Sequence, residues 1–415
     1  MFDNLLHQEA AALLIQDFVS NKLPQAVLLS GPSASGKLTC ALELARIVSC
    51  HAEGEKKGSW TCTCESCLKH KALVHPDLLL TGFRDCTLEI AAAAKTLMQA
   101  IESKEHIEAA RYLYIRSVRK LTSRFNPVLI EGDTKASKIE PLIVSLDEML
   151  EEIEPQRPLL SVDKLQKIID KIAVKSQKLE SGFMYESLPI SQIRKASAWA
   201  RYTVADSKKV LIIENADRMQ EGVRNALLKI LEEPPEDTLF VLTTTRRSAV
   251  MPTILSRVRT YSFCNRTFDQ QREVIQRVFH SDVLSPTGVI PQNDVIDYYL
   301  SGFLPIMPQR IAELANNFIE TIHKRHVPNI DNLVKEMKNF EPRVMLKMFF
   351  NELIMSHERS LYSITDAAKY AAWQEIGTKL IKTIQESYSN IITFNQSPAS
   401  AFDQIVYIFL EEGLL

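Results

Sequence analysis

No part of this 415-residue sequence is apolar over the roughly 20 residues that a membrane-spanning helix needs. Its first residues, MFDNLLHQEA, lack the basic segment and the following apolar segment that make a secretory signal. We therefore expect neither a membrane protein nor a secreted one.

Net charge is also nearly absent, because the formal charge is −2. This balance argues against a protein that coats nucleic acid unaided, since such binding relies on an excess of positive charge. The seven cysteines are odd in number and unevenly spaced, which favours a cytoplasmic location over a disulfide framework. The hydrophobic fraction of 46% is that of a soluble globular protein, and the length predicts about two to four domains.

Short apolar runs indicate the buried strands of a parallel sheet. One of them, VLII, ends abruptly at the acid Glu214, and the other runs have turn or helix signals around them. The predicted strands are 27–29, 75–83, 210–213, 237–245 and 258–263. Helical patterns alternate with these strands, so we expect a doubly wound parallel α/β sheet.

Residues 84–186 interrupt this alternation. They include EIAAAAKTLMQAIESKEHIEAARYLYIRSVRKL and SVDKLQKIIDKIAVKSQKL, which have a helical period and no glycine. We interpret the segment as a helical insertion that projects from the sheet domain.

Basic and aromatic side chains gather in the first half of this insertion. They are Arg111, Tyr112, Tyr114, Arg116, Arg119, Lys120 and Arg124. Such a row suggests either a contact with nucleic acid or a solvated helix face. We favour the solvated face, because charge runs usually are exposed to water.

Beyond the last predicted strand the sequence favours helices alone. Three short helices are expected at 268–279, 294–300 and 308–324, and Pro328 ends this run. From Asn329 onward the chain has an all-helical pattern with much apolar surface. That surface suits either packing against other subunits or an ordinary helical core.

The segment GPSASGK, from Gly31 to Lys37, matches the phosphate-binding pattern G-x-x-x-x-G-K. It follows a predicted strand and opens a predicted helix, which is the context that the pattern requires. The backbone amides of such a loop, here including those of Ser35 and Gly36, cradle phosphates at the helix N-terminus. Lys37 would reach the β- and γ-phosphates.

The magnesium ligand of this pattern is missing. A Ser or Thr should follow the lysine, but the residue is Leu38, and Thr39 comes one place late. One residue turns a side chain by about 100° around a helix, so Thr39 is a poor substitute. The loop therefore either binds ATP with doubtful magnesium placement or is a vestige that keeps its glycines for the turn.

The acidic strand end departs from the hydrolase pattern as well. Two successive acids usually stand there, one for the magnesium shell and one to polarise the attacking water. Here Glu214 is followed by Asn215, whose amide cannot take a proton. Thr244 and Thr245 end the next predicted strand, and nothing in the residues alone makes them more than polar strand ends.

A cluster of cysteines predicts a structural zinc site. Cys64 and Cys67 form a C-x-x-C pair, Cys62 lies one residue before that pair, and Cys50 would close the set of four. His70 is a reserve ligand. Free thiols are the alternative, but four clustered cysteines in a cytosolic protein favour metal, and a full set of four leaves no open coordination position.

The stretch NALLKILEEPP, residues 225–235, is the most specific in the chain. It resembles the sequence that follows the acidic strand in the AAA+ module of bacterial DNA polymerase III clamp-loader subunits. PTILSR, 252–257, resembles the Ser-Arg-Cys motif of that family, with Val258 where cysteine is expected. The cysteine cluster also falls where the family carries its zinc module, and the resemblance covers about 1–83 and 187–265.

The resemblance implies an α/β architecture with three parts. An AAA+ P-loop parallel sheet domain would hold a zinc module and the helical insertion, and a helical lid and an all-α collar domain would follow. The implied bounds are 1–265 for the AAA+ core, about 50–70 for the zinc module, about 84–186 for the insertion, 266–327 for the lid and 328–415 for the collar.

Two roles exist in that family, and the residues favour one of them. Gamma/tau subunits are ATPase motors with an intact loop and acidic pair, whereas delta-prime is a stator that supplies an arginine to the neighbouring motor. Leu38 and Asn215 depart from the motor pattern while Arg257 is present, so the chain resembles delta-prime. The resemblance implies gamma/tau and delta subunits as partners, and contact with the sliding clamp and primed DNA through the complex.

Two other interpretations stay open. An active gamma/tau-type motor would retain Lys37 and would use Asp217 as a displaced acid. A zinc-stabilised helical adaptor would have the insertion as its working part. In the family Thr244 or Thr245 would sense γ-phosphate, and Arg310 stands near the position of a second sensing arginine in the lid.

Overall fold

The computed structural model describes residues 1–202, 208–282, 294–362, 364–394 and 396–411. The chain forms two compact units, Met1–Leu300 and Ser301–Leu415, which are treated separately below. In the described ranges, every helix is too short or too polar to cross a membrane.

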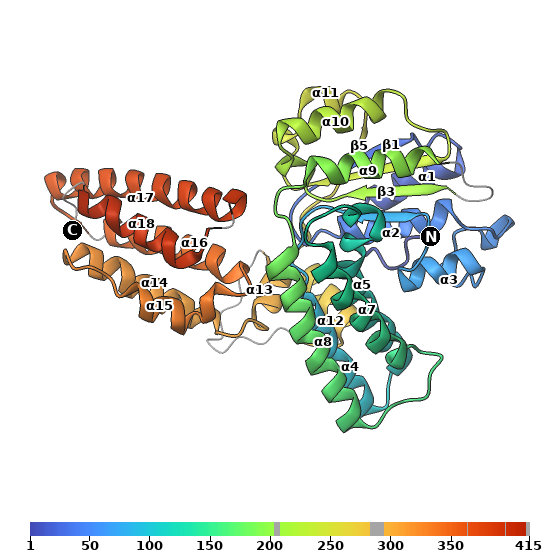
Figure 1. Ribbon diagram of the computed structural model, residues 1–415, viewed down its shortest axis with the longest axis horizontal. Coiled ribbons are helices and arrows are strands. Elements are labelled where there is room, and N and C mark those ends of the chain that lie inside the picture. Colours follow the sequence, from blue (N-terminus) through green and yellow to red (C-terminus); the bar gives the residue numbers. More distant parts are fainter. Residues whose placement is uncertain (203–207, 283–293, 363, 395, 412–415) are drawn as a thin grey trace. The chain divides into compact units, whose positions relative to one another are not determined.

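A five-stranded parallel sheet forms the centre of the first unit (Figure 1). Its order is β2-β3-β4-β1-β5, and each neighbouring pair is parallel. The strands are β1 (Ala26–Ser30), β2 (Leu78–Thr81), β3 (Lys209–Ile213), β4 (Thr238–Thr244) and β5 (Arg259–Ser262). All five predicted strands are thereby confirmed, and their carboxyl ends share one edge of the sheet.

Helices cover both faces of this sheet, as a doubly wound fold requires. Successive residues of a strand point to opposite faces, so Val27 packs into one core and Leu28 into the other. Figure 1 shows α9 and α10 on the side of the sheet opposite to α2. The helices of this part are α1 (Ala10–Val19), α2 (Lys37–Val48), α3 (Glu65–Ala72), α9 (Ile190–Arg201), α10 (Glu221–Glu232) and α11 (Pro252–Leu255).

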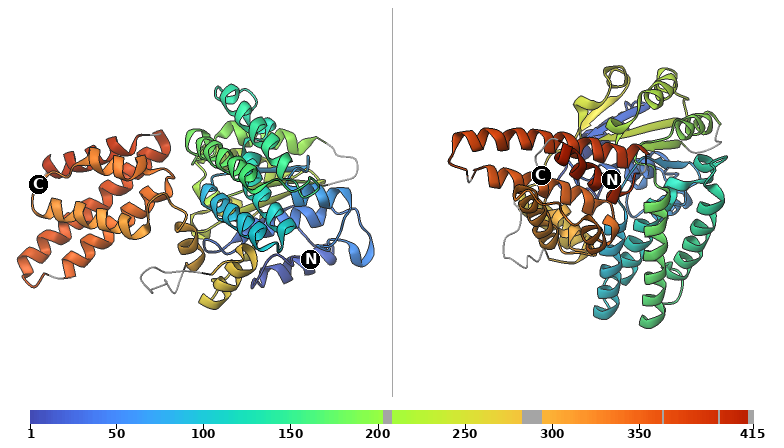
Figure 2. Two further views of the ribbon diagram at one scale, coloured as in Figure 1. Left: turned by 90° about the horizontal axis from the view of Figure 1, so that it is seen from below. Right: turned by 60° about the vertical axis from the view of Figure 1, so that its left-hand side comes forward.

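The segment between β2 and β3 is a helical insertion, as predicted. Its long helices lie side by side below the sheet in Figure 1 and again in the right-hand view of Figure 2. They bury a hydrophobic core of their own, which includes Leu97, Leu121, Leu146 and Ile172. The helices are α4 (Thr87–Ser103), α5 (Ile107–Thr122), α6 (Pro127–Ile130), α7 (Ala136–Ile153) and α8 (Val162–Phe183).

The basic row of the insertion lies neither on a solvated face nor on a nucleic-acid surface, so both predictions were wrong. Arg111, Arg119 and Arg124 are at most 6% exposed, and Tyr114 is fully buried. The arginines donate to backbone carbonyls, as Arg111 does to the carbonyl of Ile153 at 2.6 Å. The reason is that α5 packs against α3, α4, α7 and α8, which cover the aliphatic parts of the arginine side chains. Because the guanidinium groups are buried as well, they need hydrogen-bond acceptors inside the protein.

The remaining elements are helical, as predicted. In the second unit Phe318, Phe340, Phe349 and Phe402 pack together with ring centroids 5.1–6.1 Å apart. The first unit ends with α12 (Phe268–Phe279) and α13 (Val295–Ser301), whose last residue begins the second unit. The helices of the second unit are α14 (Pro308–His323), α15 (Ile330–Glu336), α16 (Val344–Tyr362), α17 (Ala367–Phe394) and α18 (Pro398–Glu411). Short 3₁₀ turns are η1 (Gly54–Lys56), η2 (Ser123–Phe125), η3 (Ala216–Arg218), η4 (Arg247–Ala249) and η5 (Lys338–Phe340). The predicted lid and collar boundaries stay predictions.

Candidate functional site

The loop from Gly31 to Lys37 joins β1 to α2 at the carboxyl edge of the sheet. Gly36 has φ of 94°, a left-handed conformation that glycine adopts without strain. A Cβ on Gly31 would lie 2.5 Å from the carbonyl oxygen of Phe263, so this position also requires glycine. Both glycines are therefore needed for the fold of the loop, whether or not it binds phosphate.

Lys37 is turned back onto its own loop. Its Nζ donates to the carbonyl of Gly31 at 2.8 Å, to Ser35 Oγ at 3.3 Å and to the carbonyl of Pro32. Burial lowers the pKa of Lys37 to about 8, although the nearby Glu214 carboxylate raises it. A phosphate would have to displace these three acceptors to reach the ammonium group.

Leu38 and Thr39 stand at the start of α2, where the phosphate-binding pattern expects a magnesium ligand. Leu38 is 4% exposed and belongs to the hydrophobic core on one face of the sheet. Thr39 is half-buried one position further along the helix. The position that a magnesium-binding hydroxyl would take is thus occupied by a core side chain.

Glu214, at the carboxyl end of β3, is bound by two arginines. Arg84 Nη1 donates to Glu214 Oε1 at 3.2 Å, and Arg124 Nη2 donates to Glu214 Oε2. The carboxylate is 7% exposed, and burial alone would raise its pKa, but Arg124 and Arg84 outweigh burial and hold the pKa below its usual value. The acid that would face magnesium in a motor is therefore neutralised inside the chain.

The same arginines belong to a larger ion network. Arg84 Nη2 also donates to Glu89 Oε2 at 3.1 Å, and Lys120 pairs with the other oxygen of Glu89. Burial raises the pKa of Glu89, but Lys120 and Arg84 lower it to about 2. The sequence did not identify Arg84 as a partner of Glu214, and Arg124 was predicted to lie on a basic helix face. The available signal was Glu214 itself, because an acid at the end of a buried strand with no second acid beside it needs a cation nearby.

Asn215 and Thr244 have structural partners too. Asn215 is left-handed, with φ of 55°, and its Nδ2 donates to the carbonyl of Phe83 at 2.7 Å. Thr244 is fully buried, and its hydroxyl donates to Asp217 Oδ1 at 2.7 Å. Arg246 approaches the other Asp217 oxygen at 3.5 Å, while Thr245 is exposed.

Arg257 lies just beyond α11 and is exposed. Its Nη2 donates to Glu232 Oε1 at 2.8 Å, and its Nη1 donates to the carbonyl of Thr253 at 2.8 Å. Glu232 is 53% exposed, so this ion pair lies at the surface. Arg310 is in α14 of the second unit, where it pairs with Glu313 and Glu336.

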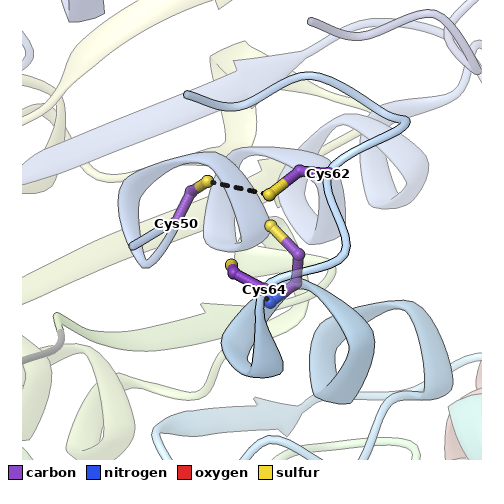
Figure 3. A group of neighbouring side chains, drawn as sticks. Cys50, Cys62 and Cys64 are labelled. Atoms are coloured by element: carbon purple, nitrogen blue, oxygen red, sulfur yellow. Dashed lines mark hydrogen bonds between the residues drawn. The ribbon is translucent and has the colours of Figure 1, made fainter. Parts of the chain in front are cut away.

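The four predicted cysteine ligands come together at one point (Figure 3). Cys50 follows α2, Cys62 and Cys64 precede α3, and Cys67 lies within α3. All four sulfurs are within 4.8 Å of one another, and those of Cys50 and Cys62 are 3.7 Å apart. Tetrahedral zinc with Zn–S bonds of about 2.3 Å requires sulfurs about 3.8 Å apart, so the set can hold a metal ion.

Hydrogen-bond donors around the sulfurs suit thiolates. The backbone amide of Gly58 donates to Cys50 at 3.3 Å, and Arg46 Nη1 donates to Cys67 at 3.3 Å. Burial raises the pKa of Cys64, but the backbone amides of Cys67 and His51 lower it to about 6. His70 is not part of the set of four; it stacks on His75 with ring centroids 4.0 Å apart, and Cys50 therefore takes the fourth place.

The sequence is similar to a known protein family and to several of its members. Residues 6–140 and 148–267 match the family described as DNA polymerase III, delta subunit. The chain is 30% identical over 135 residues to the delta' subunit of Bacillus subtilis DNA polymerase III, which covers 32% of this chain and 34% of that one. It is 31% identical over 127 residues to the gamma/tau subunit of Mycobacterium tuberculosis H37Rv, covering 27% and 22% respectively.

A shorter match reaches 46% identity over 80 residues with the delta' subunit of Pseudomonas aeruginosa, covering 19% of this chain and 24% of that one. The aligned segments thus span between about a fifth and a third of the length of these relatives. A solved gamma subunit-related protein of Thermotoga maritima is 16% identical with a TM-score of 0.27, covering 58% of this chain and 90% of that one. Because the family match spans more than half of the sequence, the chain belongs to the DNA polymerase III delta subunit family.

Proposed function

We propose that this chain is the delta-prime-like stator of the DNA polymerase III clamp loader in DNA replication. In this role it supplies Arg257 to a neighbouring ATPase subunit and hydrolyses little or no ATP itself. Family membership and the similarity to delta' subunits support the complex. The binding of Glu214 by Arg84 and Arg124 supports the stator role.

Each polar group that a motor would turn toward a magnesium nucleotide already has an intramolecular partner. Lys37 donates to its loop, Glu214 accepts from two arginines, Asn215 donates to Phe83, and Thr244 donates to Asp217. A hydrolytic site needs such groups free and aimed at the reacting phosphate. Because these groups are paired inside the chain, we infer that the protein keeps the fold of an ATPase but does not hydrolyse ATP.

Magnesium does not fit the residues present. Its usual ligand on α2 is replaced by the buried Leu38, and the Glu214 carboxylate has both oxygens engaged by guanidiniums. A divalent cation there would face Arg84 and Arg124 at close range, which is electrostatically unfavourable. ATP would therefore bind, if at all, through Lys37 and the loop amides.

The exposure of Arg257 supports a role outside its own domain. Its pair with Glu232 is exposed, and such surface pairs are worth about 0–1 kcal/mol, so opening it is easy. A guanidinium offered to another subunit's nucleotide stabilises the charge that develops on the transferring phosphoryl group. Lysine would replace it poorly, because a point charge lacks the planar fork of donors.

Structural zinc is the second component of the proposal. The four thiolates of Cys50, Cys62, Cys64 and Cys67 fill a tetrahedral shell, so no position is left for substrate. The metal would cross-link the segment between α2 and β2 and so stabilise its fold. It would take no part in phosphate chemistry.

The proposed role implies gamma/tau and delta subunits as partners, contact with the sliding clamp and primed DNA through the assembled complex, and a cytoplasmic location. Polymerase activity would belong to the complex. An active gamma/tau-type motor is the second candidate, favoured by Lys37 and by the similarity to a gamma/tau subunit. A zinc-stabilised adaptor built on the insertion is the third.

Reconstitution tests the proposal directly. The purified chain is mixed with gamma/tau and delta subunits of the same organism, and the mixture is analysed by size-exclusion chromatography with light scattering. A stoichiometric complex that loads clamps only when this chain is present supports the stator. Failure to enter any complex overturns it.

A further inference from the structure

Helix α3 connects the cysteine cluster to the insertion. Cys64 is the N-cap of α3 and Cys67 lies in its first turn. At the other end, Arg116 of α5 donates to the carbonyls of His70 at 3.3 Å and Lys71 at 2.6 Å. Arg119 of α5 donates to the carbonyl of Ala72 at 3.0 Å. One short helix therefore has metal ligands at its start and insertion arginines at its end.

This helix has almost no apolar core to hold it in place. It is eight residues long, and its buried side chains are those of Ser66, Cys67 and His70. The small cluster around it consists of Cys50, Cys62 and Cys67, with Ala52 and Cys64 at its edge. Isolated helices of this length are unstable in water, so the proposed thiolate ligation would stabilise α3 together with its contacts to α2 and α5.

Helix α5 carries the contact onward to the acidic strand end. Arg124 follows α5 in η2, eight residues after Arg116, which is a rise of about 12 Å along a helix. Arg124 donates to the carbonyl of Gly82 at 2.8 Å and to the Glu214 carboxylate. The same rigid element thus touches α3 at one place and the ends of β2 and β3 at another.

The insertion meets the sheet domain through these polar contacts and through α6, which packs against α9. The hydrophobic core of the insertion is separate from the two cores of the sheet. Among the described residues, Leu129 of α6 is the one buried apolar side chain of the insertion that packs into a sheet core. Arg119 and Arg124 are nearly buried, and a buried guanidinium that loses its acceptors is strongly destabilised. Loss of α3 would therefore disturb α5.

We propose that metal at the cysteine cluster positions the insertion, so that zinc occupancy sets whether Arg84 and Arg124 hold Glu214. The inference rests on the zinc site proposed above. Its path runs from Cys64 and Cys67 through α3 to Arg116 and Arg119, and along α5 to Arg124. Zinc would thus reach the nucleotide-binding edge without contacting it.

Cys86 reports on this arrangement. It precedes α4 beside Arg84 and is 1% exposed, so it reacts with a maleimide only when the insertion shifts. Cys40, in the sheet core, is fully buried and monitors unfolding of the whole domain. Cys264 is exposed and monitors the reagent. Peptide mass spectrometry after brief N-ethylmaleimide treatment reads all three in one sample.

The test compares the full chain before and after removal of its metal by a strong chelator, with zinc measured by elemental analysis. We expect Cys86 labelling to rise at least about tenfold while Cys40 stays protected. A zinc-containing chain whose Cys86 stays protected after chelation overturns the coupling alone. Labelling of Cys40 together with Cys86 also overturns it, because the whole domain would then have unfolded. A chain purified without metal overturns the zinc assignment and the coupling together.

Variants test the contact with zinc still bound. The double variant Arg116→Ala, Arg119→Ala should expose Cys86 while the four cysteine ligands stay protected and the zinc content stays unchanged. Arg111→Ala is the matched control, since Arg111 lies on the same helix but donates only to carbonyls of the insertion itself. Cys86 should remain protected in that control. Equal labelling in the double variant and the wild type overturns the proposed path.

Discussion

Arg124, in the turn η2 that follows α5, donates to the carboxylate of Glu214, at the end of strand β3. The two residues are 90 positions apart in the chain and both are nearly buried. In this protein the acidic strand end therefore anchors the insertion, and its charge is neutralised by the arginines.

Replacing Glu214 should affect stability before it affects any chemistry. Glu214→Gln leaves Arg124 without its counter-charge and leaves Arg84 with Glu89 alone, and breaking a buried pair costs about 3–5 kcal/mol. We expect the free energy of unfolding, measured by urea denaturation, to fall by roughly 3 kcal/mol. Glu232→Gln, at the exposed pair with Arg257, is the control and should change stability by less than about 1 kcal/mol. Equal stability of both variants would contradict the anchoring role.

The isolated chain should hydrolyse ATP negligibly. Leu38 removes a magnesium ligand, and Asn215 cannot polarise water. A steady-state assay should give turnover far below the usual enzyme range of about 1 s⁻¹ and above. A turnover near that value that disappears in Lys37→Ala would instead establish the motor.

Arg257→Ala should leave this chain folded and the assembled complex intact. It should slow hydrolysis at the adjacent motor site, where arginine fingers contribute roughly 10³–10⁵ in rate, and should impair loading of clamps onto primed DNA. Arg257→Lys should rescue little. Wild-type loading by the alanine variant complex would remove the finger assignment.

Metal content should follow the cysteines and not the histidine. The wild-type chain should carry about one zinc, and Cys64→Ser should lose most of it. His70→Ala should keep it, because His70 lies outside the set of four sulfurs, and burial lowers the pKa of His70 to about 2, so its ring is neutral. Elemental analysis of chain purified under reducing conditions without chelator decides between zinc and free thiols.

Stability should depend on pH through Glu180. Its carboxylate accepts from the amides of Cys86 at 2.7 Å and Thr87 at 3.0 Å, and burial raises its pKa to about 7. Between the unfolded value of about 4.3 and about 7, the folded state keeps a proton that the unfolded state has lost. The stability contribution of this group is therefore full at low pH and falls as pH rises through that window.

Glu180→Gln does not titrate and isolates this effect. Relative to the wild type, the variant should gain on the order of 3 kcal/mol of unfolding free energy as pH rises from about 5 to about 8. Urea unfolding of both proteins at several pH values measures the difference. A difference that is constant across the range would show that Glu180 has an ordinary pKa.

Much of the fold was predictable from local patterns. Each strand had an apolar run, and the loop from Gly31 to Lys37 had its glycines. These signals work because backbone conformation and burial of a strand depend on neighbouring residues. The cysteine set was predictable too, because its four members lie within 18 residues of sequence.

The sequence by itself thus determined the parallel sheet, the helical insertion, the glycine-containing loop between β1 and α2, and the cysteine cluster. Only the tertiary structure decided what the charged residues do. Arg84 and Arg124 meet Glu214 across 130 and 90 positions of chain, and Arg124 would have been solvated if the end of α5 had faced outward. A guanidinium can stay in water or, once buried, must find an acceptor, and which of the two happens depends on which helices pack over it.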